Sequence, residues 1–210
     1  MKLRNGIAAA IVAVSALTLS VGSAQAASWP TPGKECKNSG MTVTKQKMTY
    51  VCTSTGNALK WSKGVPVSTS KLTISDQWVK AADSGMSAAF GVISNPTKKP
   101  IRILGASTPA STFTQLHEVV MKDGAMVMQQ KLGGLVVPAG GSVSLKSGGD
   151  HLMLMELTKP VVAGDPVKIT LTTSDGGQLT FTAMGRVFAG ANETYDPDSG
   201  MSHGSGMSMG

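Results

Sequence analysis

Hydrophobic and polar positions alternate in short runs along the second half of the chain, and turn residues interrupt these runs at close intervals. Runs rich in Val, Ile, Leu and Thr occupy residues 88–94, 101–105, 143–145, 167–173 and 178–183. Turn sequences such as Asn95-Pro96, Asp123-Gly124 and Asp175-Gly176-Gly177 separate them. Short strands with regular turns are typical of an antiparallel sandwich or barrel, so we predict an all-β domain.

The N-terminal residues have the pattern of a secretory signal peptide. A basic start with Lys2 and Arg4 precedes an apolar stretch, and Ala24-Gln25-Ala26 offers a cleavage site of small residues. The apolar stretch is short for a membrane-spanning anchor, which is the alternative. We therefore expect an exported protein of the periplasm, cell envelope or extracellular space.

The composition of the chain changes at several points, which predicts five segments. They are a signal peptide (1–26), a small Cys-stapled Lys-rich β module (27–66), a linker (67–71), the main β-sandwich (72–190) and a flexible His/Met-rich tail (191–210).

The only two cysteines, Cys36 and Cys52, lie in the small module. In an oxidising compartment two nearby cysteines are typical of a disulfide. A metal site is the alternative, but no His lies near them in the sequence.

The net charge of +7 is concentrated in the same region, where seven lysines between Lys34 and Lys71 are opposed only by Glu35. An exported protein rarely meets nucleic acid, so we expect these lysines to contact an acidic envelope or membrane surface, or an acidic partner. Simple solubility is the alternative.

The chain has 13 Met but only three His, and each His has Met residues close by. In the segment "LHEVVMKDGAMVMQQ" the Asp123-Gly124 pair predicts a two-residue hairpin. That hairpin sets Met121 opposite Met126 and makes His117 and Met128 diagonal neighbours on one face.

The second group of donors is "GGDHLMLMEL". On a strand His151, Met153 and Met155 point to one face, while Leu152 and Leu154 point to the other, which we expect to be core. Together the two groups offer two imidazoles and two thioethers.

Thioethers are soft neutral donors that suit Cu(I) and bind Mg²⁺ or Ca²⁺ poorly. Met stripes also fill hydrophobic cores, but core packing leaves the repeated association of His with Met unexplained.

Segments across the main domain resemble the periplasmic copper chaperone family of the PCuAC type. They include "DQWVKA", "VISNPT", "LHEVVMKDGAMVM" and "PAGGSVSLKSGGDHLMLMEL". The family motif is His, ten residues, Met, twenty-one residues, His-x-Met. This chain has ten residues between His117 and Met128 and twenty-two between Met128 and His151, with Met153 completing His-x-Met. Asp150 stands where the family usually carries an aromatic residue.

The resemblance implies a cupredoxin-like antiparallel Greek-key β-sandwich that binds Cu(I) through His117, Met128, His151 and Met153. Met126 is the alternative to Met128 as third ligand, and Met128 is favoured. The resemblance also implies copper delivery toward cytochrome c oxidase assembly, with an oxidase subunit or another copper chaperone as acceptor.

The tail is similar to His/Met-rich extensions of some family members. It predicts an accessory copper site, with Cu(II) bound through His203. The accessory donors are Met126, Met201, His203, Met207 and Met209.

Other functions fit less well. A blue-copper electron carrier needs a thiolate, and no Cys follows residue 72. Neither a Ser-His-Asp arrangement nor HExxH is evident, so we do not expect an enzyme. Copper sequestration and a metal-free cell-surface adhesion module remain the alternatives to copper delivery.

Overall fold

A computed structural model describes residues 30–56, 58–191 and 194–195. The described residues form strands and turns without a helix, and none of their segments is a helix able to cross a membrane. The predicted signal peptide and most of the predicted tail lie outside the described residues.

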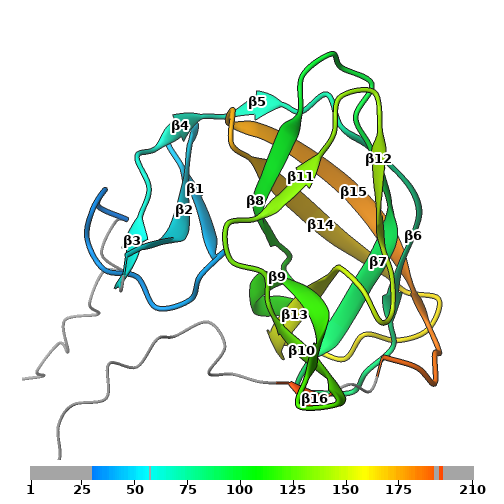
Figure 1. The fold of residues 1–210 in the computed structure, drawn as a ribbon. Coiled ribbons are helices and arrows are strands. Elements are labelled where there is room, and N and C mark those ends of the chain that lie inside the picture. The colour runs from blue at the N-terminus through cyan, green and yellow to red at the C-terminus, as the bar shows by residue number, and fades with distance from the viewer. Residues whose placement is uncertain (1–29, 57, 192–193, 196–210) are drawn as a thin grey trace, which may run out of the picture.

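A small N-terminal sheet comes first in the chain and lies to one side of the main body (Figure 1). Its strands are β1 (Thr42–Lys45), β2 (Met48–Thr55), β3 (Ala58–Trp61) and β4 (Val65–Pro66). The central strand β2 pairs with the other three. A disulfide joins Cys36 to Cys52, as predicted, with 5.9 Å between the two Cα atoms. By the chain-entropy model a loop of this length contributes about 3 kcal/mol.

The remaining strands form one larger sheet. They are β5 (Ser68–Thr69), β6 (Thr73–Lys80), β7 (Ser87–Ser94), β8 (Ile101–Ser107), β9 (Ser111–Lys122), β10 (Ala125–Gln130), β11 (Leu135–Val137), β12 (Ser142–Leu145), β13 (His151–Leu157), β14 (Pro166–Thr173), β15 (Gly177–Arg186) and β16 (Thr194–Tyr195).

This sheet closes on itself. The strands β8, β14, β15, β6, β7, β13 and β9 follow one another, and β8 also pairs with β9 through Ala106 and Thr114. The predicted all-β class, of sandwich or barrel form, is therefore confirmed. Most pairs are antiparallel, but β15 pairs in parallel with β5 and β6, and β10 with β16.

The barrel interior holds the main hydrophobic core. Fully buried Val, Ile and Leu side chains from β6, β7, β8, β13 and β14 meet there, among them Val79, Ile93, Ile103, Leu154 and Ile169. A second, smaller cluster of buried side chains packs on the other face of β13.

The N-terminal sheet is held against the barrel at several points. Ser68 and Thr69, in the stretch that the sequence marks as a linker, pair with β15. The Gln178 side-chain amide donates to the hydroxyl groups of Thr44 and Thr49, at 3.0 Å each. The backbone of β8 also approaches the N-terminal sheet so closely at Gly105 that an added Cβ would collide with the Gly40 carbonyl oxygen.

Candidate metal centre

Three adjacent strands of the barrel, β13, β9 and β10, carry the predicted donor residues on one face. His151 on β13 pairs directly with His117 on β9. Along the β9–β10 hairpin, Val119 pairs with Met128 and Met121 with Met126, as predicted. Asp123 and Gly124 both have positive φ, which the type I′ hairpin turn requires. The two predicted donor groups therefore lie side by side on one sheet.

His151 faces a thioether. Its Nδ1 lies 2.9 Å from the Gly149 carbonyl oxygen and its Nε2 lies 3.0 Å from Met128 Sδ. A carbonyl oxygen only accepts, so Nδ1–H donates to Gly149 and Nε2 is the ring nitrogen that contacts the sulfur. An imidazole nitrogen from β13 and a thioether sulfur from β10 thus meet across β9.

His117 is arranged in the same way. Its Nε2–H donates to Gln115 Oε1 at 2.9 Å, which leaves the lone pair on Nδ1. That nitrogen is buried and has no hydrogen-bond partner among the described residues. Metal-binding histidines commonly tie one ring nitrogen to a carbonyl or carboxylate oxygen and present the other to the ion.

Burial controls the protonation of His117. The side chain is fully buried, and burial together with the nearby charge of His151 lowers the pKa of His117 from 6.5 to about 3. The imidazole is therefore neutral at neutral pH, which is the form that binds metal.

The thioethers divide into buried and exposed sets. Met128 and Met153 belong to the smaller buried cluster, together with Met155. Met126 and Met121 are 46% and 66% exposed at the hairpin end. Of the two candidates for the third ligand, Met128 is thus the one that contacts His151.

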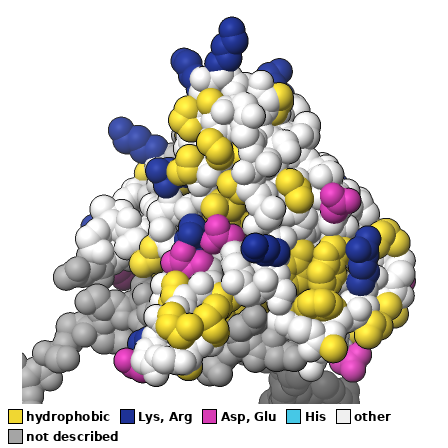
Figure 2. All heavy atoms as spheres, turned by 45° about the vertical axis from the view of Figure 1, so that its right-hand side comes forward, with side chains coloured by type: hydrophobic (Ala, Val, Ile, Leu, Met, Phe, Trp, Pro, Cys, Tyr) yellow, Lys and Arg dark blue, Asp and Glu magenta, His cyan; other side chains and the backbone are white. Residues whose placement is uncertain are grey.

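Both faces of β13 are buried. Leu152 and Leu154 enter the core as expected, and His151, Met153 and Met155 on the other face are buried too. Aromatic side chains from other strands cover them, and no imidazole is visible on the face shown in Figure 2.

This cover comes from distant parts of the chain. Trp78 on β6 packs on Phe90 of β7, with ring centroids 4.5 Å apart. Tyr195 on β16 stacks on His117 at 5.3 Å with nearly parallel rings. Sequence reasoning missed Gln115, Phe90 and Tyr195, and only Gln115, two residues before His117 and on its face, was within reach of a sequence argument.

An ion-pair network borders the two histidines. Lys131 Nζ lies 2.6 Å from Glu118 Oε2 and 3.0 Å from Asp150 Oδ1. Burial alone would raise the pKa of Glu118, but its hydrogen bonds from Lys131 and Gln129 outweigh burial and lower it. Asp150 and Glu118 each adjoin one of the histidines, so this network ties the start of β13 to β9 beside the donors.

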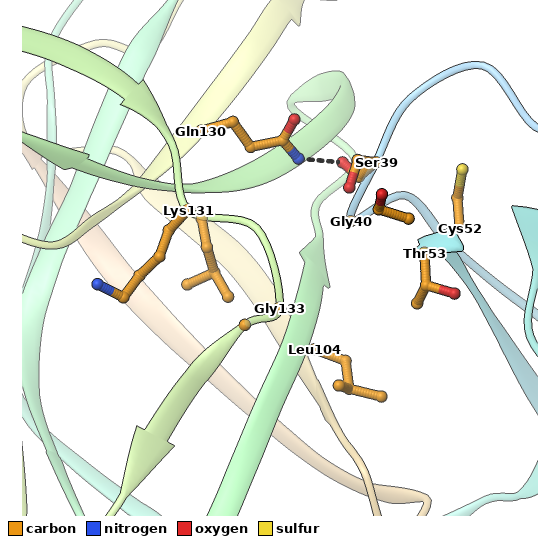
Figure 3. A pocket seen from close by; sticks show the side chains of 11 residues that line it. Ser39, Gly40, Cys52, Thr53, Leu104, Gln130, Lys131 and Gly133 are labelled. Atoms are coloured by element: carbon orange, nitrogen blue, oxygen red, sulfur yellow. Dashed lines mark hydrogen bonds between the residues drawn. The ribbon is translucent and has the colours of Figure 1, made fainter. Parts of the chain in front are cut away.

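The described residues offer few other places for a metal. No group of three or more His, Cys, Asp or Glu side chains among them lies close enough to hold an ion. A pocket of about 80 Å³ lies between the N-terminal sheet and the barrel (Figure 3). It is lined by residues such as Ser39, Thr53 and Gln130, whose amide donates to the Ser39 carbonyl oxygen, and its lining contains neither His nor Met.

Comparison with known proteins identifies the family. Residues 72–184 match the family described as "Putative lipoprotein LpqE-like". The chain is also 43% identical over 122 residues to "Putative lipoprotein Lxx21020" of Leifsonia xyli subsp. xyli, which covers 58% of this chain and 74% of that protein. The chain therefore belongs to the LpqE-like family.

Solved structures similar to the chain include copper-binding domains. The copper-bound PCuAC domain from PmoF2 is 19% identical, with a TM-score of 0.48 over 58% of this chain and 97% of that one. The solution structure of CuI-DR1885 from Deinococcus radiodurans is 30% identical, with a TM-score of 0.43 over 57% and 82% of the two chains.

Proposed function

We propose that this protein is an extracytoplasmic copper carrier that binds one Cu(I) on the β13–β9–β10 face. The ligands are His117, Met128, His151 and Met153. The observation that carries the proposal is the 3.0 Å contact between His151 Nε2 and Met128 Sδ. Because Nδ1–H donates to Gly149, Nε2 is the His151 nitrogen that can bind a metal, and an imidazole nitrogen beside a thioether sulfur suits a soft cation.

The donor set favours Cu(I) over other metals. Imidazole and thioether are neutral, and thioether is a poor ligand for Mg²⁺, Ca²⁺ and Mn²⁺. Zinc sites draw mainly on Cys, His and carboxylate, and the described residues contain no cluster of three such groups. The buried Nδ1 of His117, which has no hydrogen-bond partner among the described residues, supplies another nitrogen donor on the same face.

Transfer to an acceptor is the role that these ligands suit. Neutral donors hold the ion less tightly than thiolates do, so copper bound here can be passed on. We infer that the acceptor is a copper protein outside the cytoplasm, such as a cytochrome c oxidase subunit or another copper chaperone. The family description and the pattern of residues 1–26 support an exported, envelope-associated protein.

We propose that the Lys-rich N-terminal module contacts the envelope surface or membrane through the charge of its lysines.

Anaerobic Cu(I) titration against a chromophoric competitor tests the proposed ligands. Met153→Leu should weaken binding at least about tenfold, because it removes a sulfur donor at nearly constant volume. Met155→Leu is the matched control, since Met155 lies in the same buried cluster without being a proposed ligand. Equal Cu(I) affinities for the two variants and the wild type would show that Met153 packs in the core and does not bind copper.

The same titration tests the tail. Met201, His203, Met207 and Met209 lie outside the described residues, and we propose that they form an accessory copper site, with Cu(II) bound through His203. A chain ending at residue 196 should then bind less copper than the full chain, and an unchanged stoichiometry would remove this part of the proposal.

A further inference from the structure

The tip of the β9–β10 hairpin carries two methionines that no packing role explains. Met121 and Met126 pair directly across the hairpin, one register step from the turn. They are 66% and 46% exposed and belong to neither hydrophobic cluster. Methionine on a core face is common, but here two thioethers stand opposite each other at the surface.

The geometry of the pair suits a single soft ion. Directly opposed residues on antiparallel strands have Cβ atoms about 5 Å apart. Each Met side chain has three rotatable bonds and ends in a polarisable sulfur, so both sulfurs can close on one ion between them. Thioether donors select Cu(I) among the common metals.

The pair also lies in line with the buried donors. Met126 and Met128 are two residues apart on β10, so they share a face and are separated by about 7 Å along the strand. Met128 in turn contacts His151. Thioethers therefore run along one hairpin face from the surface to the buried site. The β9–β10 hairpin lies near the lower end of the barrel in Figure 1.

Within the described part of the chain, aromatic side chains cover the donors. Tyr195 stacks on His117, and Trp78, Phe90 and Phe113 pack around the buried methionines. The Lys80 ammonium donates to the Gly190 carbonyl oxygen at 2.7 Å, which holds the segment before β16 against the barrel.

We propose that Met121 and Met126 form a surface Cu(I) site through which copper reaches and leaves the buried His–Met site. This inference rests on the proposed copper function. With two neutral ligands the surface site binds copper more weakly than the buried one. The surface site gives the ion sulfur ligands on its way to Met128. It therefore changes the rate of copper transfer and leaves the affinity of the buried site unchanged.

Stopped-flow transfer of Cu(I) from a chromophoric chelate to the full-length protein tests the proposal. Met121→Leu/Met126→Leu should slow uptake by about tenfold or more, because the ion must then reach Met128 without a surface ligand. The control is Met86→Leu/Met184→Leu, which alters two other methionines with exposed fractions of 41% and 43%. Its uptake rate should equal that of the wild type, and an equal rate for the hairpin variant would overturn the proposal.

NMR of methionine methyl groups gives an independent readout of binding. On addition of Cu(I) alone, the methyl signals of Met121 and Met126 should shift, while those of Met86 and Met184 stay in place. Hairpin signals that move no more than the control signals would also overturn the surface site. A wild-type protein that takes up no Cu(I) in the competition titration would instead overturn the proposed function itself.

Discussion

The two barrel histidines show how side-chain chemistry is prepared residue by residue. Each donates one ring N–H to a carbonyl oxygen, His117 to Gln115 and His151 to Gly149. His117 is left with a lone pair on Nδ1, and His151 turns its Nε2 toward Met128 Sδ. A buried polar atom without a partner costs free energy in the empty protein, and His117 Nδ1 is such an atom. Copper binding would therefore relieve a cost that folding imposes.

The depressed pKa of His117 predicts a pH-dependent stability for the metal-free protein. Between pH 6.5 and about 3 the unfolded chain binds a proton at this imidazole, whereas the folded chain does not. Protonation of His117 therefore favours the unfolded chain. The free energy of unfolding is highest above pH 6.5 and falls as the pH decreases from 6.5 toward 3. The loss is at most on the order of 1.4 kcal/mol per pH unit.

Urea denaturation of the metal-free protein at several pH values between 7 and 4 measures this effect. Acidic groups such as Glu118 and Asp175, whose pKa values are also lowered, add to the slope. The comparison with His117→Gln isolates the share that belongs to the imidazole, because the variant keeps the other groups. Identical slopes for the two proteins would contradict the burial of a neutral His117.

The face on which each donor side chain lies could be predicted from the sequence, but the hydrogen-bond and ion-pair partners of the side chains could not. The His–Met spacing on one strand predicted the shared faces correctly, since alternation is a property of any strand. Gln115 as the acceptor for His117, and Asp150 as the partner of Lys131, depend on side-chain directions that spacing does not encode.

At the scale of elements, β9 is the strand on which the site depends. It pairs with β13 on one side and β10 on the other, so it holds both donor groups in register. The β10 register was predictable because Asp123-Gly124 makes a two-residue turn that specifies it. The β13 register was not, because twenty residues and two other strands separate it from the hairpin.

The approach of β8 to the N-terminal sheet gives a prediction for Gly105. In Gly105→Ala the new methyl group collides with the Gly40 carbonyl oxygen, so the N-terminal sheet must shift away from the barrel. The free energy of unfolding should fall by about 1–3 kcal/mol, as for other overpacked sites.

Hydrogen exchange measured by mass spectrometry locates the damage from Gly105→Ala. Exchange should increase in β1, β2 and the facing part of β8, and remain unchanged in β13. An unchanged exchange pattern in the N-terminal sheet would show that the close approach at Gly105 is not a structural requirement.

At the scale of the whole molecule, the donor residues are buried because the sheet closes into a barrel. Trp78 and Phe90, which pair on the consecutive strands β6 and β7, and Tyr195 on β16 are distant in the sequence from the donors, and the closed sheet brings them over β13, β9 and β10. The all-β class was predictable from short alternating runs. The second buried cluster was not, because it depends on which strands become neighbours when the sheet closes.

The N-terminal sheet adds a basic surface to this barrel. Its disulfide was predictable from two cysteines in an exported chain, but its contacts with β8, β10 and β15 were not. The Gln130 amide that bonds to Ser39 belongs to the same strand as Met128. The N-terminal sheet therefore braces the hairpin that carries the thioethers.

The most direct test of the proposed copper site is X-ray absorption spectroscopy of the Cu(I)-loaded protein. The chain should end at residue 196, so that the tail donors are absent, and carry one equivalent of copper. The proposed site predicts a first shell of two nitrogen and two sulfur atoms from the His–Met face. A shell without sulfur, or copper that stays in solution, would contradict it.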